Sequence, residues 1–245
     1  MKKFKPTLFA ISILLMLPIV SQSQEQESFI MNLTEFTVKF GQDNNFKDAV
    51  EKWNKCYKDN KGTDTWNVWH RLQGKGNVYV LSANMANWAE MDKEDPAGKA
   101  CRAVALESII PNIESAEFNV ARSMPEISRT EALGDNTIVW VTSFTVKDDA
   151  VFNEIIKDVT STVNSKDANN SGYWYSVMGG EGANYFVSSP YKDFAALDEE
   201  EDSVWKIYES VNGKSKTKET RAKFRGAIRN IWSYLYTLDN ELSMK

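Results

Sequence analysis

The segment TEFTVK at positions 34–39 occurs a second time, with one change, as TSFTVK at positions 142–147. Around the first copy, residues 32–40 alternate between apolar and polar side chains, which is the period of a β-strand. Each copy therefore predicts the first strand of a repeated unit. Within this stretch the one group suited to catalysis is Glu35, and its counterpart in the second copy is Ser143.

The chain that follows each copy stays in step with the other. An apolar stripe with helical spacing follows the first strand and returns 106 positions later. Its members are Phe46, Ala49, Val50, Trp53 and Tyr57, matched by Phe152, Ile155, Ile156, Val159 and Val163. The same offset relates the hairpin glycines Gly74 and Gly76 to Gly180 and Gly182, and it aligns Phe118 with Phe224 and Ala121 with Ala227. Such agreement indicates an internal duplication.

Within one unit the patterns predict strand, helix, strand, strand, helix, strand. After the first helix, strands are expected at 65–73 and 78–82, joined by a glycine hairpin. A helix is expected from 97 to 110, a further helical piece at 113–120, and an extended segment at 123–129. The two units are expected at residues 30–130 and 137–240.

This element order is the ferredoxin-like topology. Two such units in one chain resemble the dimeric α+β barrel superfamily, in which two four-stranded sheets pack face to face with helices outside. The expected fold class is therefore α+β, with two βαββαβ repeats forming a pseudo-dimeric barrel. A fused pair makes its own dimer contact, so a monomer with internal pseudo-two-fold symmetry is expected.

Residues 1–23 have the pattern of a signal peptide, with lysines at positions 2, 3 and 5 before the apolar run Leu8 to Val20. That run is shorter than the roughly 20 residues needed to span a bilayer, and an uncleaved anchor is the alternative. No lipobox cysteine follows it. We expect a secreted or periplasmic protein, with no membrane association after cleavage. Cleavage changes the formal net charge from −5 to −8, which argues against nucleic-acid partners.

The two cysteines are Cys56, near the end of the first predicted helix, and Cys101, near the start of the second. The two helices of a ferredoxin-like unit lie antiparallel, so these ends meet. We therefore predict a disulfide, with two buried free thiols as the alternative. The second copy replaces both cysteines, by Thr162 and Ile207.

His70 is the single histidine and lies on the second predicted strand next to Arg71. Histidine is the side chain whose unperturbed pKa lies near neutrality, so His70 is the candidate catalytic base, with Arg71 beside it, and a packed strand histidine is the alternative. Some relatives in the superfamily hold haem, but their iron ligand lies on a helix, whereas His70 lies on a predicted strand. No cofactor is therefore expected. One histidine and two distant cysteines do not make a zinc site, so no metal is expected.

A group of large side chains could line a ligand pocket: Trp66, Trp69, Tyr79, Asn84 and Trp88. The alternative is that these aromatic residues fill the barrel core. The expected function is that of an exported barrel that binds a small apolar or aromatic molecule or serves as an interaction module. The superfamily resemblance supplies the alternative, a cofactor-independent oxygenase with its pocket around His70.

Overall fold

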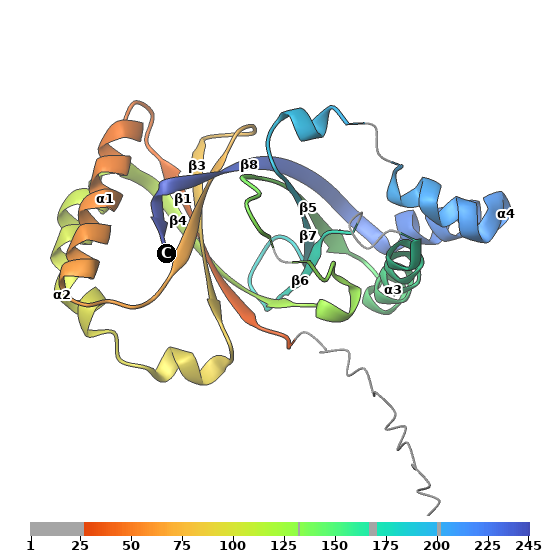
Figure 1. Cartoon of the computed structure of the whole chain (residues 1–245), viewed down its shortest axis with the longest axis horizontal. Helices are drawn as coiled ribbons and strands as arrows, with labels where there is room; N and C mark the ends of the chain where they lie inside the picture. Colours follow the sequence, from red (N-terminus) through yellow and green to blue (C-terminus); the bar gives the residue numbers. More distant parts are fainter. Residues whose placement is uncertain (1–26, 132, 167–170, 200–201) are drawn as a thin grey trace, which may run out of the picture.

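The computed structural model describes residues 27–131, 133–166, 171–199 and 202–245. Its eight strands form one closed barrel in the order β1-β3-β2-β8-β5-β7-β6-β4. Helices cover the barrel on two opposite sides, with α1 and α2 on one side and α3 and α4 on the other (Figure 1). The predicted fold class is confirmed. The expected signal peptide, residues 1–23, lies outside the described residues.

Each repeat contributes four strands and two helices. The first comprises β1 (Ile30–Val38), α1 (Asp43–Asp59), β2 (Trp66–Arg71), β3 (Asn77–Met85), α2 (Pro96–Val104) and β4 (Ile113–Ser123). The second comprises β5 (Ile138–Val146), α3 (Asp149–Lys166), β6 (Tyr173–Val177), β7 (Tyr185–Tyr191), α4 (Val204–Ala227) and β8 (Ile228–Met244). No helix in the described ranges is both long enough and apolar enough to cross a membrane.

The two repeats close the barrel by pairing β2 with β8 and β4 with β6. Every ladder is antiparallel, and β1 and β5 are four strands apart, so they run in the same direction. The pseudo-two-fold axis that relates the repeats therefore lies along the barrel axis. Equivalent residues of the two repeats consequently sit at the same height on opposite sides of the interior.

The sequence interpretation was wrong about residues 113–120. They are not a helix but most of strand β4, which pairs with β1 along its length. Inward positions of this strand are polar, among them Glu117 and Asn119, so the usual apolar alternation is missing. The proposed equivalence of Phe118 with Phe224 also fails, because Phe118 lies in β4 and Phe224 in α4.

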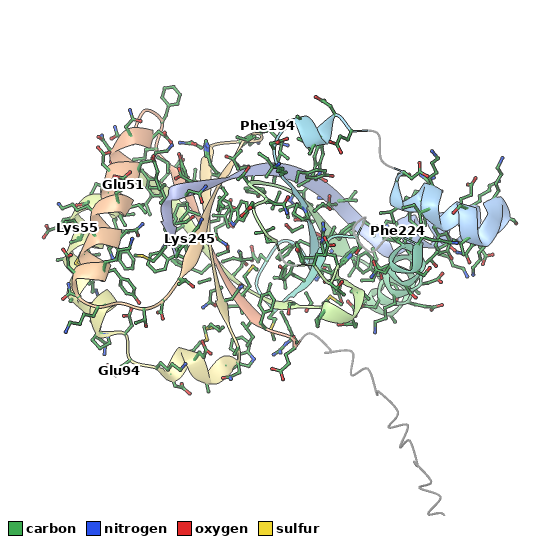
Figure 2. All side chains as sticks on the ribbon, in the orientation of Figure 1. Glu51, Lys55, Glu94, Phe194, Phe224 and Lys245 are labelled. Atoms are coloured by element: carbon green, nitrogen blue, oxygen red, sulfur yellow. A yellow bond between two sulfur atoms is a disulfide. The ribbon has the colours of Figure 1, made fainter. Side chains whose placement is uncertain are left out.

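The apolar cores lie between the sheet and the helices. In repeat one, Phe46, Tyr57 and Tyr79 are almost completely buried between α1 and the outer face of the strands. In repeat two, Phe152 and Tyr208 have the same role under α3 and α4. Charged residues of α1 such as Glu51 and Lys55 point away from the barrel (Figure 2), which is the amphipathic pattern that predicted this helix.

The predicted disulfide is confirmed. Cys56 on α1 and Cys101 on α2 are bonded, with their Cα atoms 5.9 Å apart. In repeat two the helix pair is held by apolar contacts instead, with Ile207 at the position of Cys101 and packed against Val159 and Val163. The covalent link therefore belongs to the helix layer of repeat one alone.

Candidate functional site

The interior of the barrel is hollow and forms a cavity of about 1070 Å³ that is partly open to solvent. This is at the upper end of the volumes that small-molecule sites occupy. The sequence left open whether large aromatic residues line a pocket or fill the core. In the structure they divide between the two faces of the sheet, so those packed under the helices do not fill the barrel.

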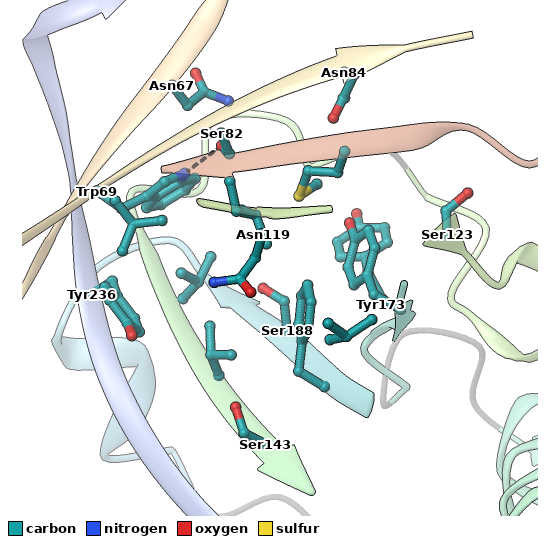
Figure 3. A pocket seen from close by; sticks show the side chains of 18 of the residues that line it. Asn67, Trp69, Ser82, Asn84, Asn119, Ser123, Ser143, Tyr173, Ser188 and Tyr236 are labelled. Carbon is teal, nitrogen blue, oxygen red and sulfur yellow. Dashed lines mark hydrogen bonds between the residues drawn. The ribbon is translucent and has the colours of Figure 1, made fainter. Parts of the chain in front are cut away.

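Repeat one supplies a wall that is mainly polar. In register across its sheet, Asn67 pairs with Ser82, Ser82 with Leu33, and Leu33 with Asn119. In the next row, Glu35 stands directly opposite Glu117. We call Glu35, Asn67, Ser82, Glu117 and Asn119 the polar wall. Trp69 is the large aromatic exception in these rows, and its indole Nε1 donates a hydrogen bond to Ser82 Oγ at 3.2 Å (Figure 3).

Repeat two supplies a wall that is mainly aromatic. In the strand register, Tyr173 is equivalent to Asn67 and Tyr234 to Asn119. Trp232 is equivalent to Glu117. We call Tyr173, Tyr175, Phe186, Trp232 and Tyr234 the aromatic wall. Tyr175 and Phe186 stack with their ring centroids 4.6 Å apart and nearly parallel planes. The two halves of the duplication have therefore diverged most on the surface that faces the cavity.

Several polar groups face the cavity without a protein partner. Among the described residues, the side chains of Asn119, Ser143 and Ser188 make no hydrogen bond, and all three line the cavity (Figure 3). Tyr175 is only 7% exposed, and its hydroxyl also has no partner within the described ranges. Burial raises the pKa of the Tyr175 hydroxyl above its ordinary value, so it stays protonated at neutral pH. Buried polar groups are normally paired, so the unpaired Tyr175 hydroxyl is available to a bound molecule, as are the three half-buried side chains.

The cavity lining carries more acidic than basic side chains. Its lining includes Glu27, Glu35, Glu117, Glu131 and Glu181 against Arg71 and Lys245. Arg71 lies 3.8 Å from Glu35, and Glu131 is paired with Arg129 at 3.0 Å. Glu117 and Glu181 are exposed at the cavity rim, and Glu117 has no ion pair within the described part of the chain.

The pKa of the Glu35 carboxyl group is raised by its surroundings in the cavity. Burial raises its pKa, the Arg71 guanidinium opposes this rise, and the charge of Glu117 adds to it, so that the pKa lies above its ordinary value. Arg71 itself is only 8% exposed, lies over the ring of Tyr234 and donates to the carbonyl of Lys75. Arg71 thus offsets one of the two facing carboxylates and leaves the other uncompensated.

The structure divides the residues that the sequence proposed for the site. Trp66, Trp69, Arg71 and Asn84 line the cavity, although the Trp66 ring also packs against Trp53 and Tyr57 on the helix side. The cavity lining does not include His70, Tyr79 or Trp88. Neighbouring residues of a strand point to opposite faces, so His70 and Arg71 lie on opposite sides of β2. Trp88 belongs to a short exposed helical turn after β3.

His70 takes part in a hydrogen-bonded network beneath α1. Its Nε2 lies 2.7 Å from Asn77 Oδ1, and its ring stacks on Tyr79 at 4.5 Å. Asn77 and Tyr79 both donate to the Asp43 carboxylate in the first turn of α1, at 2.6 Å. Burial acts to raise the Asp43 pKa, but these hydrogen bonds and the charge of Lys47 outweigh it and lower the pKa.

A haem bound through histidine or cysteine does not fit this chain. His70, the one histidine in the sequence, lies outside the cavity lining and is hydrogen-bonded to Asn77. Cys56 and Cys101 are joined to each other on the outer helix layer. The described residues also contain no group of three or more histidine, cysteine or carboxylate side chains arranged to hold a metal ion. The cavity lining provides polar and aromatic side chains for contacts with an organic molecule, and no histidine or free cysteine to ligate a haem iron.

The sequence interpretation missed most of the lining from the last strand of each repeat. Trp232, Tyr234 and Tyr236 alternate along β8, and this period of two is a signal that could have identified an inward aromatic face. On β4 the apolar alternation that marks an inward face is weaker. Its inward residues Glu117 and Asn119 border the cavity and do not pack against other side chains, so they can be polar.

Comparison with solved structures shows the same fold at low identity. A proposed monooxygenase from Lactobacillus acidophilus NCFM aligns with a TM-score of 0.53 and 13% identity, covering 89% of this chain and 99% of that one. A proposed monooxygenase from Fusobacterium nucleatum aligns with a TM-score of 0.50 and 17% identity, covering 87% and 93%. A chlorite dismutase variant from Candidatus Nitrospira defluvii aligns with a TM-score of 0.53 and 10% identity, covering 88% and 92%. No family model and no curated protein matches the chain. The chain is therefore similar to dimeric α+β barrels in fold, and its function has to be argued from its own residues.

Proposed function

We propose that the protein binds one small, flat, largely apolar or aromatic organic molecule inside the barrel. The observation that carries this proposal is the cavity between the polar wall and the aromatic wall. A well-packed interior has few voids larger than a water molecule, so a space of this size implies a function. The rings of the aromatic wall would stack on the ligand, and the unpaired amide of Asn119 and hydroxyls of Ser143, Ser188 and Tyr175 would orient it.

The proposal is tested by a thermal-shift screen of small aromatic compounds against three forms of the protein. Ser188→Trp places a large ring inside the cavity, and His70→Ala removes a side chain outside it. We expect compounds that stabilise the wild type to lose their effect with S188W and to keep it with H70A. Hits that survive S188W would contradict the proposal, and hits lost only with H70A would move the site to the helix side.

The oxygenase alternative requires His70 and Arg71 to act on one molecule. Arg71 lines the cavity, but His70 is held against Asn77 and Tyr79 on the opposite face of β2. This placement favours binding or chemistry by Glu35 and Arg71 over chemistry by His70. An assay of oxygen consumption with the compounds found in the screen distinguishes them, because an oxygenase that depends on His70 would lose turnover of its substrate with H70A.

We also propose that the protein acts outside the cytoplasm. The sequence pattern of residues 1–23 supports export, and the bond between Cys56 and Cys101 is of the kind that persists in oxidising compartments. Intact-mass analysis of the protein recovered from its native host tests this. A mature chain that begins near residue 24 is expected, and a full-length reduced chain would contradict the proposal.

A further inference from the structure

We infer that the ligand of the barrel is an organic cation: an amine or related N–H-rich group on an aromatic body, with its positive charge held between Glu35 and Glu117. This inference rests on the proposed function, since it names the chemical class that the same cavity takes. Its evidence is the arrangement of charge inside the barrel.

The first observation is the pairing of two carboxylates. Glu35 and Glu117 are directly opposite each other on β1 and β4, and both side chains line the cavity. Like charges at directly opposed positions destabilise a sheet. Arg71 neutralises Glu35 from the other side at 3.8 Å, but it is also held by the Lys75 carbonyl and the Tyr234 ring. Glu117 has no cation of its own among the described residues, so a ligand cation would remove an existing repulsion.

The second observation is what lies across the barrel. On the opposite side of the barrel, Ser143 is the equivalent of Glu35 and Trp232 is the equivalent of Glu117, so repeat two has no charges at these positions. Trp232, Phe186 and Tyr234 line the cavity, and the faces of aromatic rings attract cations as well as flat rings. A ligand that extends from the carboxylate pair towards Trp232 would therefore meet favourable contacts at both ends.

The third observation is independent of the carboxylates. Tyr175 is 7% exposed, lines the cavity, and has a hydroxyl with no partner in the described ranges. The amide of Asn119 also faces the cavity without a hydrogen bond. Carboxylates only accept hydrogen bonds, and hydroxyl and amide oxygens accept them as well. The Tyr175 hydroxyl of the aromatic wall and the Asn119 amide of the polar wall can therefore bond to one ligand from both walls, and the carboxylates favour a ligand whose edge donates.

The experiment compares three probes that share an indole ring and differ in charge: tryptamine, the neutral tryptophol and the anion indole-3-acetate. Their binding to the full mature protein is measured by isothermal titration calorimetry at pH 7 in low and high salt. We expect tryptamine to bind about three- to tenfold more tightly than tryptophol, with indole-3-acetate weakest. Added salt should narrow the difference, because it screens charges near the rim.

The variants assign the preference to the carboxylate pair. Glu117→Gln should reduce tryptamine binding to the level of tryptophol and leave tryptophol unchanged, and Glu117→Lys should favour indole-3-acetate. Glu114→Gln, on the same strand but outside the cavity lining, is the matched control and should change neither. Without ligand, E117Q should melt no lower than the wild type, because it removes a like-charge pair.

The outcomes separate this inference from the proposed function. Equal affinity for the three probes, a preference for the anion, no binding of any of the three, or an E117Q variant that keeps the tryptamine preference would overturn the cation inference. If aromatic compounds still bind in a manner that S188W abolishes, the proposed function stands with a ligand of another class. If S188W abolishes nothing, both fail.

Discussion

Tyr79 and Tyr185 occupy equivalent positions on β3 and β7, and each donates a hydrogen bond of 2.6 Å to the first-turn aspartate of the first helix in its repeat, Asp43 or Asp149. The bond is therefore part of the repeated unit. Tyr79→Phe should lower the free energy of unfolding by about 1–2 kcal/mol, because hydrogen bonds to charged groups are worth this much or more. Tyr185→Phe should behave alike, as measured by chemical denaturation.

Tyr175→Phe is the matched control, since the Tyr175 hydroxyl has no hydrogen bond to lose within the described residues. It should change the unfolding free energy little. Equal losses for Y79F and Y175F would show that the bond to Asp43 does not anchor α1.

The perturbed carboxyl of Glu35 predicts a dependence of stability on pH. Its pKa is raised in the folded protein, so the contribution of Glu35 to stability is fully present below its unfolded pKa and is lost as pH rises through the folded pKa. Glutamine does not titrate. The stability of Glu35→Gln relative to wild type, measured as the difference between their free energies of unfolding, should therefore increase from pH 4 to pH 7. A difference that is constant over this range would contradict the assignment.

At the scale of elements, the disulfide makes the two helix layers unequal. The bond between Cys56 and Cys101 closes a loop with a sequence separation of 45 residues. Replacing both cysteines by alanine should cost about 2–4 kcal/mol, since the cross-link restricts the unfolded chain. Dithiothreitol should lower the melting temperature of the wild type and leave that of the double variant unchanged. An equal effect of the reductant on both would show that the bond does not stabilise the fold.

The elements also show how far the sequence could lead. β1 and α1 were predictable because the outer face of β1 packs against the inner face of α1, so Phe36, Val38 and Phe46 leave clear periodic patterns. β4 was not, because its inner face borders a cavity and is free to carry Glu117, whereas on β8 the alternating aromatic residues were a signal that the sequence interpretation missed. The equivalence of the last segments was lost because α4 is longer than α2 and is interrupted at Gly213. The strand register gives a different equivalence. Ser115 of β4 pairs with Thr37, and Asn230 of β8 pairs with the equivalent Thr145, so Ser115 corresponds to Asn230.

The candidate site was predicted in part for the same reason. Trp66, Trp69 and Asn84 were expected in a pocket and line the cavity, whereas Tyr79, expected with them, lies beneath α1. Arg71, proposed as a catalytic residue, also lines the cavity. Residue type does not tell which face of a strand a tyrosine or histidine occupies when both faces are covered. The register of the barrel decides it, and that depends on contacts between the two repeats.

At the scale of the whole molecule, the duplication keeps the outside and changes the inside. The tyrosine–aspartate anchors are present in both repeats, but the interior has Glu35, Asn67 and Glu117 in one half and Ser143, Tyr173 and Trp232 in the other. A homodimer would have to present the same groups twice. Fusion of the two units in one chain allows the two walls to differ, which is what a ligand with unlike sides requires.

The hollow barrel is the central claim, and a crystal structure of the protein with a compound from the thermal-shift screen tests it most directly. Electron density for the compound is expected inside the barrel, between Asn119 of the polar wall and the rings of Tyr234 and Trp232. Density on the helix side near His70, or a barrel interior closed by its own side chains, would contradict the account.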